Sequence, residues 1–242
     1  MGMFSHLFYP WGLILQGLAI VHFIRRRPDN YWFYVILFLG PPGALIYLLV
    51  EAIPDAGPTF KLFSRRNRIG QLEAAIRDNP SPGNYEELGD LYLEDGKLAR
   101  AREAYERAIA ARATTIDPFY HRGVCALLLG DAPAALPDLE RTVRESPNHD
   151  FYRAQGLLAH AYAQTAQPEK AEAQFEQATS RSTLSETYLN YADFLAAQGR
   201  PTEARSWAQK VLDKRPSLLG YQRRRERPNF RRASKLLKTL PA

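Results

Sequence analysis

The chain has 242 residues, of which 24% are charged and 12% aromatic, a composition that excludes disordered, collagen-like and low-complexity proteins. Its single Cys excludes an internal disulfide framework and any zinc or iron–sulfur site that needs several thiolates. Residues 1–70 carry 7 basic and 3 acidic residues, residues 71–220 carry 17 and 22, and residues 221–242 carry 8 and 1. Because the excess positive charge lies at the two ends, the net charge of +6 argues little for a nucleic-acid-binding body.

Two uncharged apolar runs, Leu7–Ile24 and Tyr31–Val50, dominate the first fifty residues. At about 1.5 Å per residue the first run is about 27 Å long, close to the thickness of a hydrocarbon core. We therefore expect residues 1–54 to form a transmembrane helical hairpin with Arg25–Arg27 in its link. The Gly40–Gly43 segment, GPPG, predicts that the second span is either kinked or broken there.

Two other interpretations of these runs remain open. A cleaved signal peptide fits poorly, because no Lys or Arg precedes Leu7 and a second apolar run follows the first. Two buried helices of a soluble core are also disfavoured, because such helices usually interleave polar residues. The hairpin resembles the membrane-anchoring segment ahead of cardiolipin synthases and phospholipase D-type nucleases, in its Arg25–Arg27 turn, Trp32 and the block Phe38–Tyr47. Those enzymes need a His-x-Lys motif, and no histidine here is followed two residues on by Lys, so no phosphodiesterase activity is implied.

The body of the chain repeats itself at an interval of 34 residues. Gly89 and Gly123, and likewise Ala101 and Ala135, are separated by 34 positions, and two further copies continue at slightly altered spacing. Each copy contains an apolar helical stripe, a turn and a second stripe. Small residues recur where two helices of a pair would cross closely: Gly89, Gly123, Ala159 and Ala192 on the first helices, and Ala101, Ala135, Ala171 and Ala204 on the second.

This pattern resembles the tetratricopeptide repeat and implies four repeats over residues 83–216. Residues 55–82 are expected to form a linker and an unpaired helix from Lys61 to Asp78, and residues 217–242 a basic tail. A capping helix is expected from Leu218 to Leu240, interrupted near Pro228. The predicted fold class is thus all-α: a transmembrane hairpin, an α-solenoid of about four helix pairs and a C-terminal capping helix. Three positions depart from the family pattern and predict looser or kinked packing: Arg122, Pro137 and Gln155.

The resemblance implies that the first helices line a concave groove that binds a partner polypeptide. The positions that would face it are Glu86, Glu87, Asp90, Glu94, Tyr120, His121, Val124, Leu128, Arg153, Leu157, His160, Gln164, Glu186, Leu189, Asn190 and Asp193. The first repeat contributes carboxylates, so a basic or mixed-polarity peptide is the expected partner. The alternative is that these acids only form a solvated helix face.

No catalytic motif accompanies the repeats. His121 and Cys125 are four residues apart, yet no third metal ligand lies close in sequence, and a small buried thiol beside a histidine explains the pair better. Glycine-rich phosphate loops, G-x-S-x-G and H-E-x-x-H are absent. We therefore expect no enzyme, no cofactor and no metal.

The basic tail has three interpretations: a solvated capping helix, a surface for anionic lipid, or a surface for nucleic-acid phosphates. The hairpin makes lipid the better partner and nucleic acid the poorer one. The residues expected to contact lipid or another anion are Arg223, Arg224, Arg225, Arg227, Arg231 and Arg232.

The predicted function is a membrane-anchored scaffold or assembly factor of the bacterial inner membrane that holds a protein partner. The alternative is a regulator that associates with anionic lipid through the hairpin and the tail. Orientation rests on three arginines in the link against Lys61, Arg65, Arg66 and Arg68 after the second span, nearly a tie. We place the repeats on the cytoplasmic side. The partner, the pathway and the oligomeric state are left open.

Overall fold

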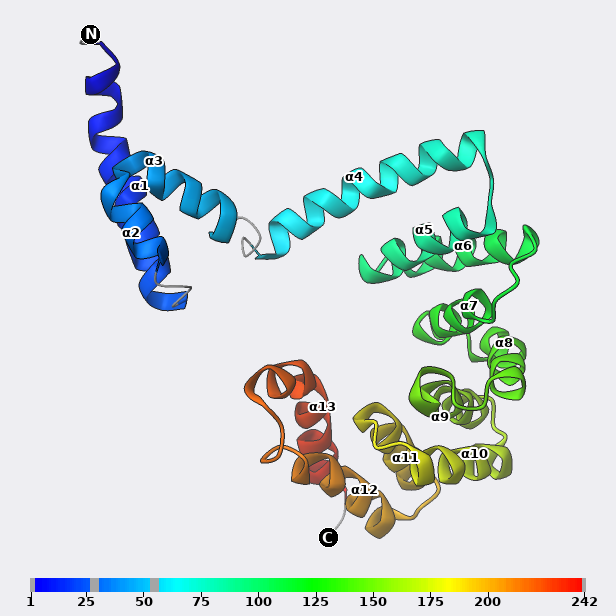
Figure 1. The fold of residues 1–242 in the computed structure, drawn as a ribbon. Helices are drawn as coiled ribbons and strands as arrows, with labels where there is room; N and C mark the ends of the chain where they lie inside the picture. The colour runs from blue at the N-terminus through cyan, green and yellow to red at the C-terminus, as the bar shows by residue number, and fades with distance from the viewer. Residues whose placement is uncertain (1–2, 27–30, 53–56, 241–242) are drawn as a thin grey trace. The chain divides into compact units, whose positions relative to one another are not determined.

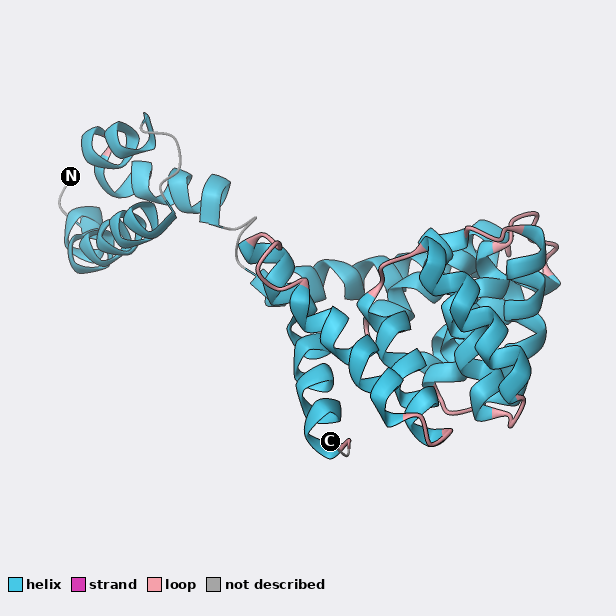
Figure 2. Ribbon diagram, turned by 90° about the horizontal axis from the view of Figure 1, so that it is seen from below, coloured by secondary structure: helices cyan, strands magenta, loops and turns pink. Residues whose placement is uncertain are grey.

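The computed structural model describes the backbone of residues 3–26, 31–52 and 57–240, and every regular element there is a helix (Figures 1 and 2). The chain divides into two compact units, Met1–Gln71 and Leu72–Ala242. Helix α4 (Gly57–Asp78) belongs in part to each of them.

The N-terminal unit contains α1 (Met3–Arg26), α2 (Tyr31–Phe38), α3 (Gly40–Tyr47) and a short π-helical segment (Leu48–Ala52). The second apolar run is therefore broken, and the break lies at Gly40, whose φ of +62° is a left-handed conformation that glycine adopts without a steric penalty. A Cβ added to Gly43 would lie 2.2 Å from the Val35 carbonyl oxygen, so α3 packs directly on the backbone of α2. Within the residues that the structure describes, no helix has both the length and the apolar character needed to cross a membrane.

The interior of this unit combines apolar packing with polar contacts. Trp32, Ile36 and Tyr47 are buried among the three helices. Nδ1 of His22 lies 2.8 Å from the Tyr47 hydroxyl, and the Gln16 amide donates to the Ile36 carbonyl at 3.1 Å. Apolar side chains cover the outside instead. Those exposed on the outside are Trp11, Leu13, Ile14, Leu18, Val21, Ile24, Tyr31, Phe33, Tyr34, Leu37, Phe38, Leu39, Leu45, Ile46, Leu49 and Val50.

The second unit is a curved array of helix pairs followed by one further helix (Figure 1). The pairs are α5 (Pro82–Glu94) with α6 (Leu98–Ala110), α7 (Asp117–Leu128) with α8 (Ala132–Glu145), α9 (His149–Gln164) with α10 (Pro168–Arg181), and α11 (Ser185–Ala197) with α12 (Pro201–Asp213); α13 (Gly220–Thr239) follows. Three of the turns within pairs use a glycine with positive φ, the usual way to end a helix: Gly96, Gly130 and Gly199. Figure 1 shows α5, α7, α9 and α11 along the inner side of the curve, which we call the inner face.

Small residues mark the helix crossings, as the repeat pattern predicts. A Cβ on Gly89 would lie 2.6 Å from Cε1 of Tyr105, and one on Gly123 would lie 3.1 Å from Cγ of Leu139. The six alanines predicted at the other crossings have no exposed surface. The structure adds a crossing between repeats, since a Cβ on Gly156 would lie 2.5 Å from the Thr187 hydroxyl.

The positions that depart from the repeat pattern are accommodated by polar pairs. Arg122 donates two hydrogen bonds to Asp138, at 2.7 and 2.8 Å, and this pair joins α7 to α8 where other repeats use apolar contacts. The Gln155 side chain is 5% exposed and donates to the Gln177 amide oxygen at 2.6 Å. Helix α8 runs through Pro137. At Arg122 and Gln155 specific hydrogen bonds thus join the helices of each pair.

Helix α13 packs on the last helix pair through Phe230 and Ala233, which are buried with Tyr188, Leu189 and Val211. The predicted interruption at Pro228 was wrong, because α13 is helical from Gly220 to Thr239 with this proline inside it. Packing of one face on α11 and α12 compensates for the backbone donor that proline lacks.

Candidate partner-binding surface

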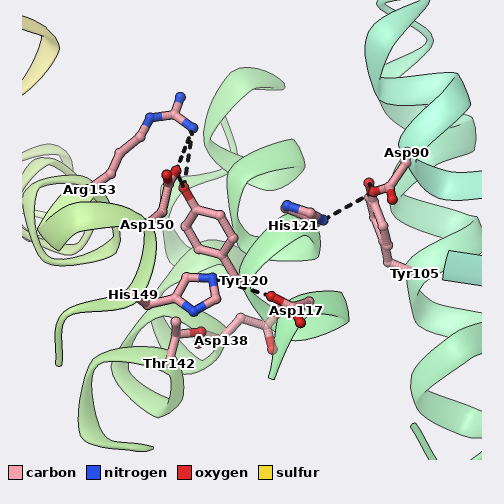
Figure 3. A network of polar contacts seen from close by, with 10 residues as sticks. All are labelled: Asp90, Tyr105, Asp117, Tyr120, His121, Asp138, Thr142, His149, Asp150 and Arg153. Atoms are coloured by element: carbon pink, nitrogen blue, oxygen red, sulfur yellow. Dashed lines mark hydrogen bonds and ion pairs between the residues drawn. The ribbon is translucent and has the colours of Figure 1, made fainter. Parts of the chain in front are cut away.

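Polar side chains connect successive repeats along the inner face (Figure 3). Between the first and second repeats, Nδ1 of His121 on α7 lies 3.2 Å from Oδ1 of Asp90 on α5. The same carboxylate accepts a hydrogen bond of 2.7 Å from the Tyr105 hydroxyl on α6. Asp90 and His121, both predicted to face the partner, are thus brought together by neighbouring repeats.

A second group of contacts joins the middle repeats to the last one. The Tyr120 hydroxyl donates to Oδ2 of Asp150 at 2.7 Å, and Nη1 of Arg153 donates to the Tyr120 oxygen at 3.2 Å. Nε of Arg153 also donates to Oε2 of Glu186 on α11 at 2.7 Å. His149 packs edge-on against Tyr120, with ring centroids 4.5 Å apart, and its Nε2 lies 3.6 Å from Asp117. These contacts fix the mutual orientation of α7, α9 and α11.

The start of α9 has an unusual backbone that places Asp150 in this network. Asp150, Phe151 and Tyr152 have φ of 47°, 54° and 64°, three consecutive left-handed residues, none of them glycine. Such residues cost roughly 1–2 kcal/mol each relative to right-handed geometry. The hydrogen bond from Tyr120 to Asp150 helps to hold this turn, which leaves the Phe151 side chain 82% exposed.

Three carboxylates interact with one another at the first two repeats: Glu86, Asp90 and Asp117. The pKa of Glu86 is raised, by burial first and then by the carboxylates of Asp117 and Asp90. Burial opposes the ionisation of Asp90, but the neighbouring His121 and the hydrogen bond from Tyr105 outweigh this effect, so the pKa of Asp90 lies below its ordinary value. Glu86 therefore lies close to two further carboxylates, whose charge a nearby cation would offset.

Charge is balanced further along the inner face. Burial disfavours the charged form of Arg153, yet the hydrogen bonds to Glu186 and the nearby Asp150 keep its pKa above the ordinary value. Burial raises the pKa of Tyr120 as well, so its hydroxyl stays protonated and donates to Asp150. In this part of the inner face each carboxylate has a basic or hydroxyl partner.

Helix α13 covers the last repeat. Nη2 of Arg232 donates to Oδ1 of Asn190 at 2.9 Å and to Oδ2 of Asp193 at 2.5 Å. Burial and the Arg232 charge together lower the pKa of His160, against the opposing effects of Asp193 and Glu186. Asn190 and Asp193, predicted to face the partner, are therefore occupied by the chain itself.

The remaining predicted positions differ in their accessibility. Val124, Leu157 and Leu189 are 5%, 6% and 0% exposed and belong to the apolar interior rather than to the inner surface. Leu128 is 59% exposed, and Gln164 lies 3.0 Å from Nε2 of His160. Glu87 and Glu94 lie on α5.

No metal centre emerges from the described residues. Cys125 is fully buried, and burial raises the pKa of its thiol to about 11. No group of three or more His, Cys, Asp or Glu side chains in the part of the chain that the structure describes is arranged to hold a metal ion. His121 pairs with Asp90 instead.

The predicted anion-contacting arginines separate into two sets. Arg223, Arg224, Arg227 and Arg231 line one cleft on α13, whereas Arg232 turns to α11 and Arg225 lies outside the cleft lining. Arg215, Lys235 and Lys238 also line the cleft and were not among the residues predicted to contact an anion. The sequence carried a signal for one of them, because Lys235 continues the four-residue spacing of Arg227 and Arg231. Asp117 and Asp150 were also missed, since their roles depend on contacts between repeats.

Comparison with known proteins agrees with this architecture. The family described as tetratricopeptide repeat matches residues 69–115, 86–150 and 157–218, together more than half of the chain. No curated protein sequence matches.

Among solved structures, YrrB, a TPR protein described as having an unusual peptide-binding site, superposes with a TM-score of 0.55 at 22% identity, covering 65% of this chain and 84% of that one. MamA (residues 41 to the end) from Desulfovibrio magneticus RS-1 gives 0.58 at 21%, with 64% and 87% covered. PilW, described as a type IV pilus biogenesis factor, gives 0.55 at 14%, with 73% and 84% covered. At these identities the likeness concerns the fold, and the family match identifies the repeats: the chain belongs to the tetratricopeptide repeat family.

Proposed function

We propose that the array is a scaffold that binds a protein partner along its inner face and carries out no chemistry itself. The observation that carries this proposal is the gathering of the carboxylates of Glu86, Asp90 and Asp117 at the first two repeats. Burial first, and then the charges of Asp117 and Asp90, raise the pKa of Glu86 against the opposing effect of His121, and a further cation beside these three carboxylates would be stabilised by their charge. A partner segment with a Lys or Arg side chain supplies that cation, and its backbone would run from α5 toward α9.

The contacts of α13 limit where the partner sits. Arg232 donates hydrogen bonds to Asn190 and Asp193, so these two side chains are not free to bind a partner. The accessible part of the inner face therefore comprises α5, α7 and the start of α9. The exposed ring of Phe151 lies at that start and offers an apolar contact beside the polar network. The described peptide-binding site of YrrB supports a peptide as the class of partner for a protein of this fold.

Photo-crosslinking of the full chain in its native cells, followed by mass spectrometry of captured proteins, tests the proposal. The variant Glu86→Gln/Asp117→Asn removes the negative region without changing side-chain size. The matched control Glu169→Gln/Glu176→Gln removes the same charge from exposed positions on α10. Loss of the same captured protein in the first variant alone is expected, and a synthetic segment of that protein should bind through its Lys or Arg. Equal capture by both variants would contradict the proposal.

We further propose that the N-terminal unit attaches the array to the inner membrane, with the array on the cytoplasmic side. The specific observation is the distribution of side chains in this unit, where the hydrogen bonds of Gln16 and His22 lie inside and apolar side chains cover the outside. In water such an outer surface is unfavourable, whereas lipid accepts it.

Flotation of the full chain with phosphatidylcholine vesicles measures this attachment. The variant Leu18→Arg/Leu45→Arg places charge on the exposed apolar surface of the unit and should abolish flotation. The control Leu128→Arg/Phe151→Arg makes the same change at exposed positions of the array and should float like the parent. Retention of the first variant on vesicles would contradict the proposal. A reporter fused at the C-terminus then reads the orientation.

A further inference from the structure

Helix α13 presents a row of cations on one side. The cleft beside it has a volume of about 610 Å³, and no carboxylate contributes to its lining. Its lining residues are Arg215, Arg223, Arg224, Arg227, Phe230, Arg231, Ser234, Lys235 and Lys238. Arg223, Arg227, Arg231 and Lys235 follow one another at four-residue intervals, which places them on one side of a helix. We call the seven basic side chains of this lining the cationic face.

These cations are left without counter-charges by the way α13 packs. Ala233 and the contacts of Arg232 hold α13 to α11 and α12, and Phe230, which also lines the cleft, packs into the array. Glu226, the one acid of residues 221–242, accepts a hydrogen bond from Asn229 instead. Among the described residues no member of the cationic face forms an ion pair or a side-chain hydrogen bond. Mutual repulsion within the face therefore favours binding of a polyanion.

The neighbouring side chains favour a lipid surface over a nucleic acid. Leu219 and Tyr221, at the start of α13, are 60% and 68% exposed and suit the boundary between headgroups and acyl chains. Binding of single-stranded nucleic acid relies on exposed aromatic rings on which bases stack. The aromatic residue of the cleft, Phe230, is only 8% exposed because it packs into the array.

We propose that the cationic face binds the headgroups of anionic phospholipids, with Leu219 and Tyr221 entering the headgroup layer. The proposal rests on the proposed membrane attachment only for bringing a bilayer close to the array. It adds a second contact of the chain with the membrane, one that depends on lipid charge and on salt.

The test uses the full chain with a polarity-sensitive fluorophore on Ser217→Cys, in a Cys125→Ala background so that the label is unique. Ser217 is exposed and lies two residues before Leu219. Vesicles of phosphatidylcholine alone are compared with vesicles in which about a third of the lipid is phosphatidylglycerol. We expect the emission to shift only with the anionic vesicles and to return to its original position in high salt.

A charge variant and a matched control complete the test. Each cation near an anionic surface raises binding by about fivefold, so replacing Arg223, Arg224, Arg227 and Arg231 with Gln should raise the phosphatidylglycerol content needed for the shift, with a loss of apparent affinity of at least about tenfold. The control replaces four exposed cations elsewhere in the array, Arg112, Arg144, Lys170 and Lys210, and should behave like the parent. Circular dichroism verifies that both variants are folded.

Three results would overturn the proposal. The first is an emission shift with phosphatidylcholine vesicles equal to that with anionic vesicles, and the second is an equal loss of apparent affinity in the control variant. The third is displacement of the labelled chain from anionic vesicles by a single-stranded RNA oligonucleotide whose phosphate concentration is lower than the phosphate concentration of the lipid. Failure of the membrane attachment is distinguishable, because it abolishes flotation with phosphatidylcholine and leaves the charge-dependent shift intact.

Discussion

Substitution of Gly89 by Ala perturbs the closest helix crossing in the first repeat. The added Cβ would lie 2.6 Å from Cε1, 2.8 Å from Cδ1 and 2.9 Å from Cζ of the Tyr105 ring. Tyr105 is fully buried, and its hydroxyl is held by Asp90 at 2.7 Å, so the ring has little freedom to move aside. The helix pair must therefore separate, or the hydrogen bond to Asp90 must lengthen.

Two opposing contributions set the magnitude. Alanine is favoured over glycine in a helix interior by about 1 kcal/mol. Overpacking of a filled interior costs about 1–3 kcal/mol. We expect Gly89→Ala to lower the free energy of unfolding by up to about 2 kcal/mol. The second repeat suggests a rescue, because Gly123 faces the smaller Leu139 at 3.1 Å, and Gly89→Ala combined with Tyr105→Leu should recover about half of the loss.

Urea unfolding of the full chain followed by circular dichroism measures these differences. Gly70→Ala is the matched control, since Gly70 lies within α4 and a Cβ there would have no neighbour within 4 Å. It should stabilise the chain by up to about 1 kcal/mol. If Gly89→Ala proves as stable as Gly70→Ala, the small residues are not needed for close helix crossing and the packing account fails.

Three further predictions concern polar and strained positions of the array. Asp138→Leu should lower the free energy of unfolding by about 3 kcal/mol, because it leaves the Arg122 guanidinium without its carboxylate partner. The double variant Arg122→Leu/Asp138→Leu should stay within about 1 kcal/mol of the parent in urea unfolding. A double variant as unstable as Asp138→Leu would disprove this. Phe151→Gly raises the melting temperature by relieving about 1 kcal/mol of left-handed strain, while Leu128→Gly, in a right-handed helix, lowers it. The pKa of His160 is lowered in the folded chain, so the contribution of His160 to stability is present above about pH 6.5 and is lost as the pH falls through the folded pKa. His160→Gln should therefore flatten the pH dependence of the melting temperature in this range. An unchanged pH profile would refute the lowered pKa of His160.

The sequence was sufficient for the repeats because their geometry is local. A close helix crossing requires a small residue at a fixed place in each pair, so the spacing of Gly89, Gly123 and the buried alanines predicts the helix pairs directly. The turns within pairs also have a local signal, since Gly96, Gly130 and Gly199 end helices with a positive φ that few other residues adopt.

The inner face was predictable only in part. Asp90, His121, Tyr120 and Arg153 could be assigned to one side of their helices by spacing, but their pairing depends on how one repeat stacks on the next. The contact of Arg232 with Asp193 joins residues 39 positions apart and has no local signature. The left-handed turn at Asp150 contradicts local preference and persists because Tyr120 holds it from another helix.

For the N-terminal apolar runs, the sequence left the course of the backbone undecided. Hydrophobicity alone predicts two spanning helices, yet Gly40 breaks the second run into two helices that fold together with α1. A glycine with positive φ between apolar stretches is compatible with a kink or with a break, and packing of Gly43 against the Val35 carbonyl decides for the break.

The central claim is that the inner face around Glu86 binds a cationic side chain of a partner. A raised folded pKa means that ionised Glu86 costs folding free energy at neutral pH, a cost that Glu86→Gln removes and that disappears below about pH 4.3. Nuclear magnetic resonance titration of the Glu86 carboxyl carbon measures this pKa directly. We predict a midpoint above about 4.3 in the free chain, lowered by Asp117→Asn and lowered further when an arginine-containing peptide is added. A midpoint that does not move with the peptide would contradict the claim.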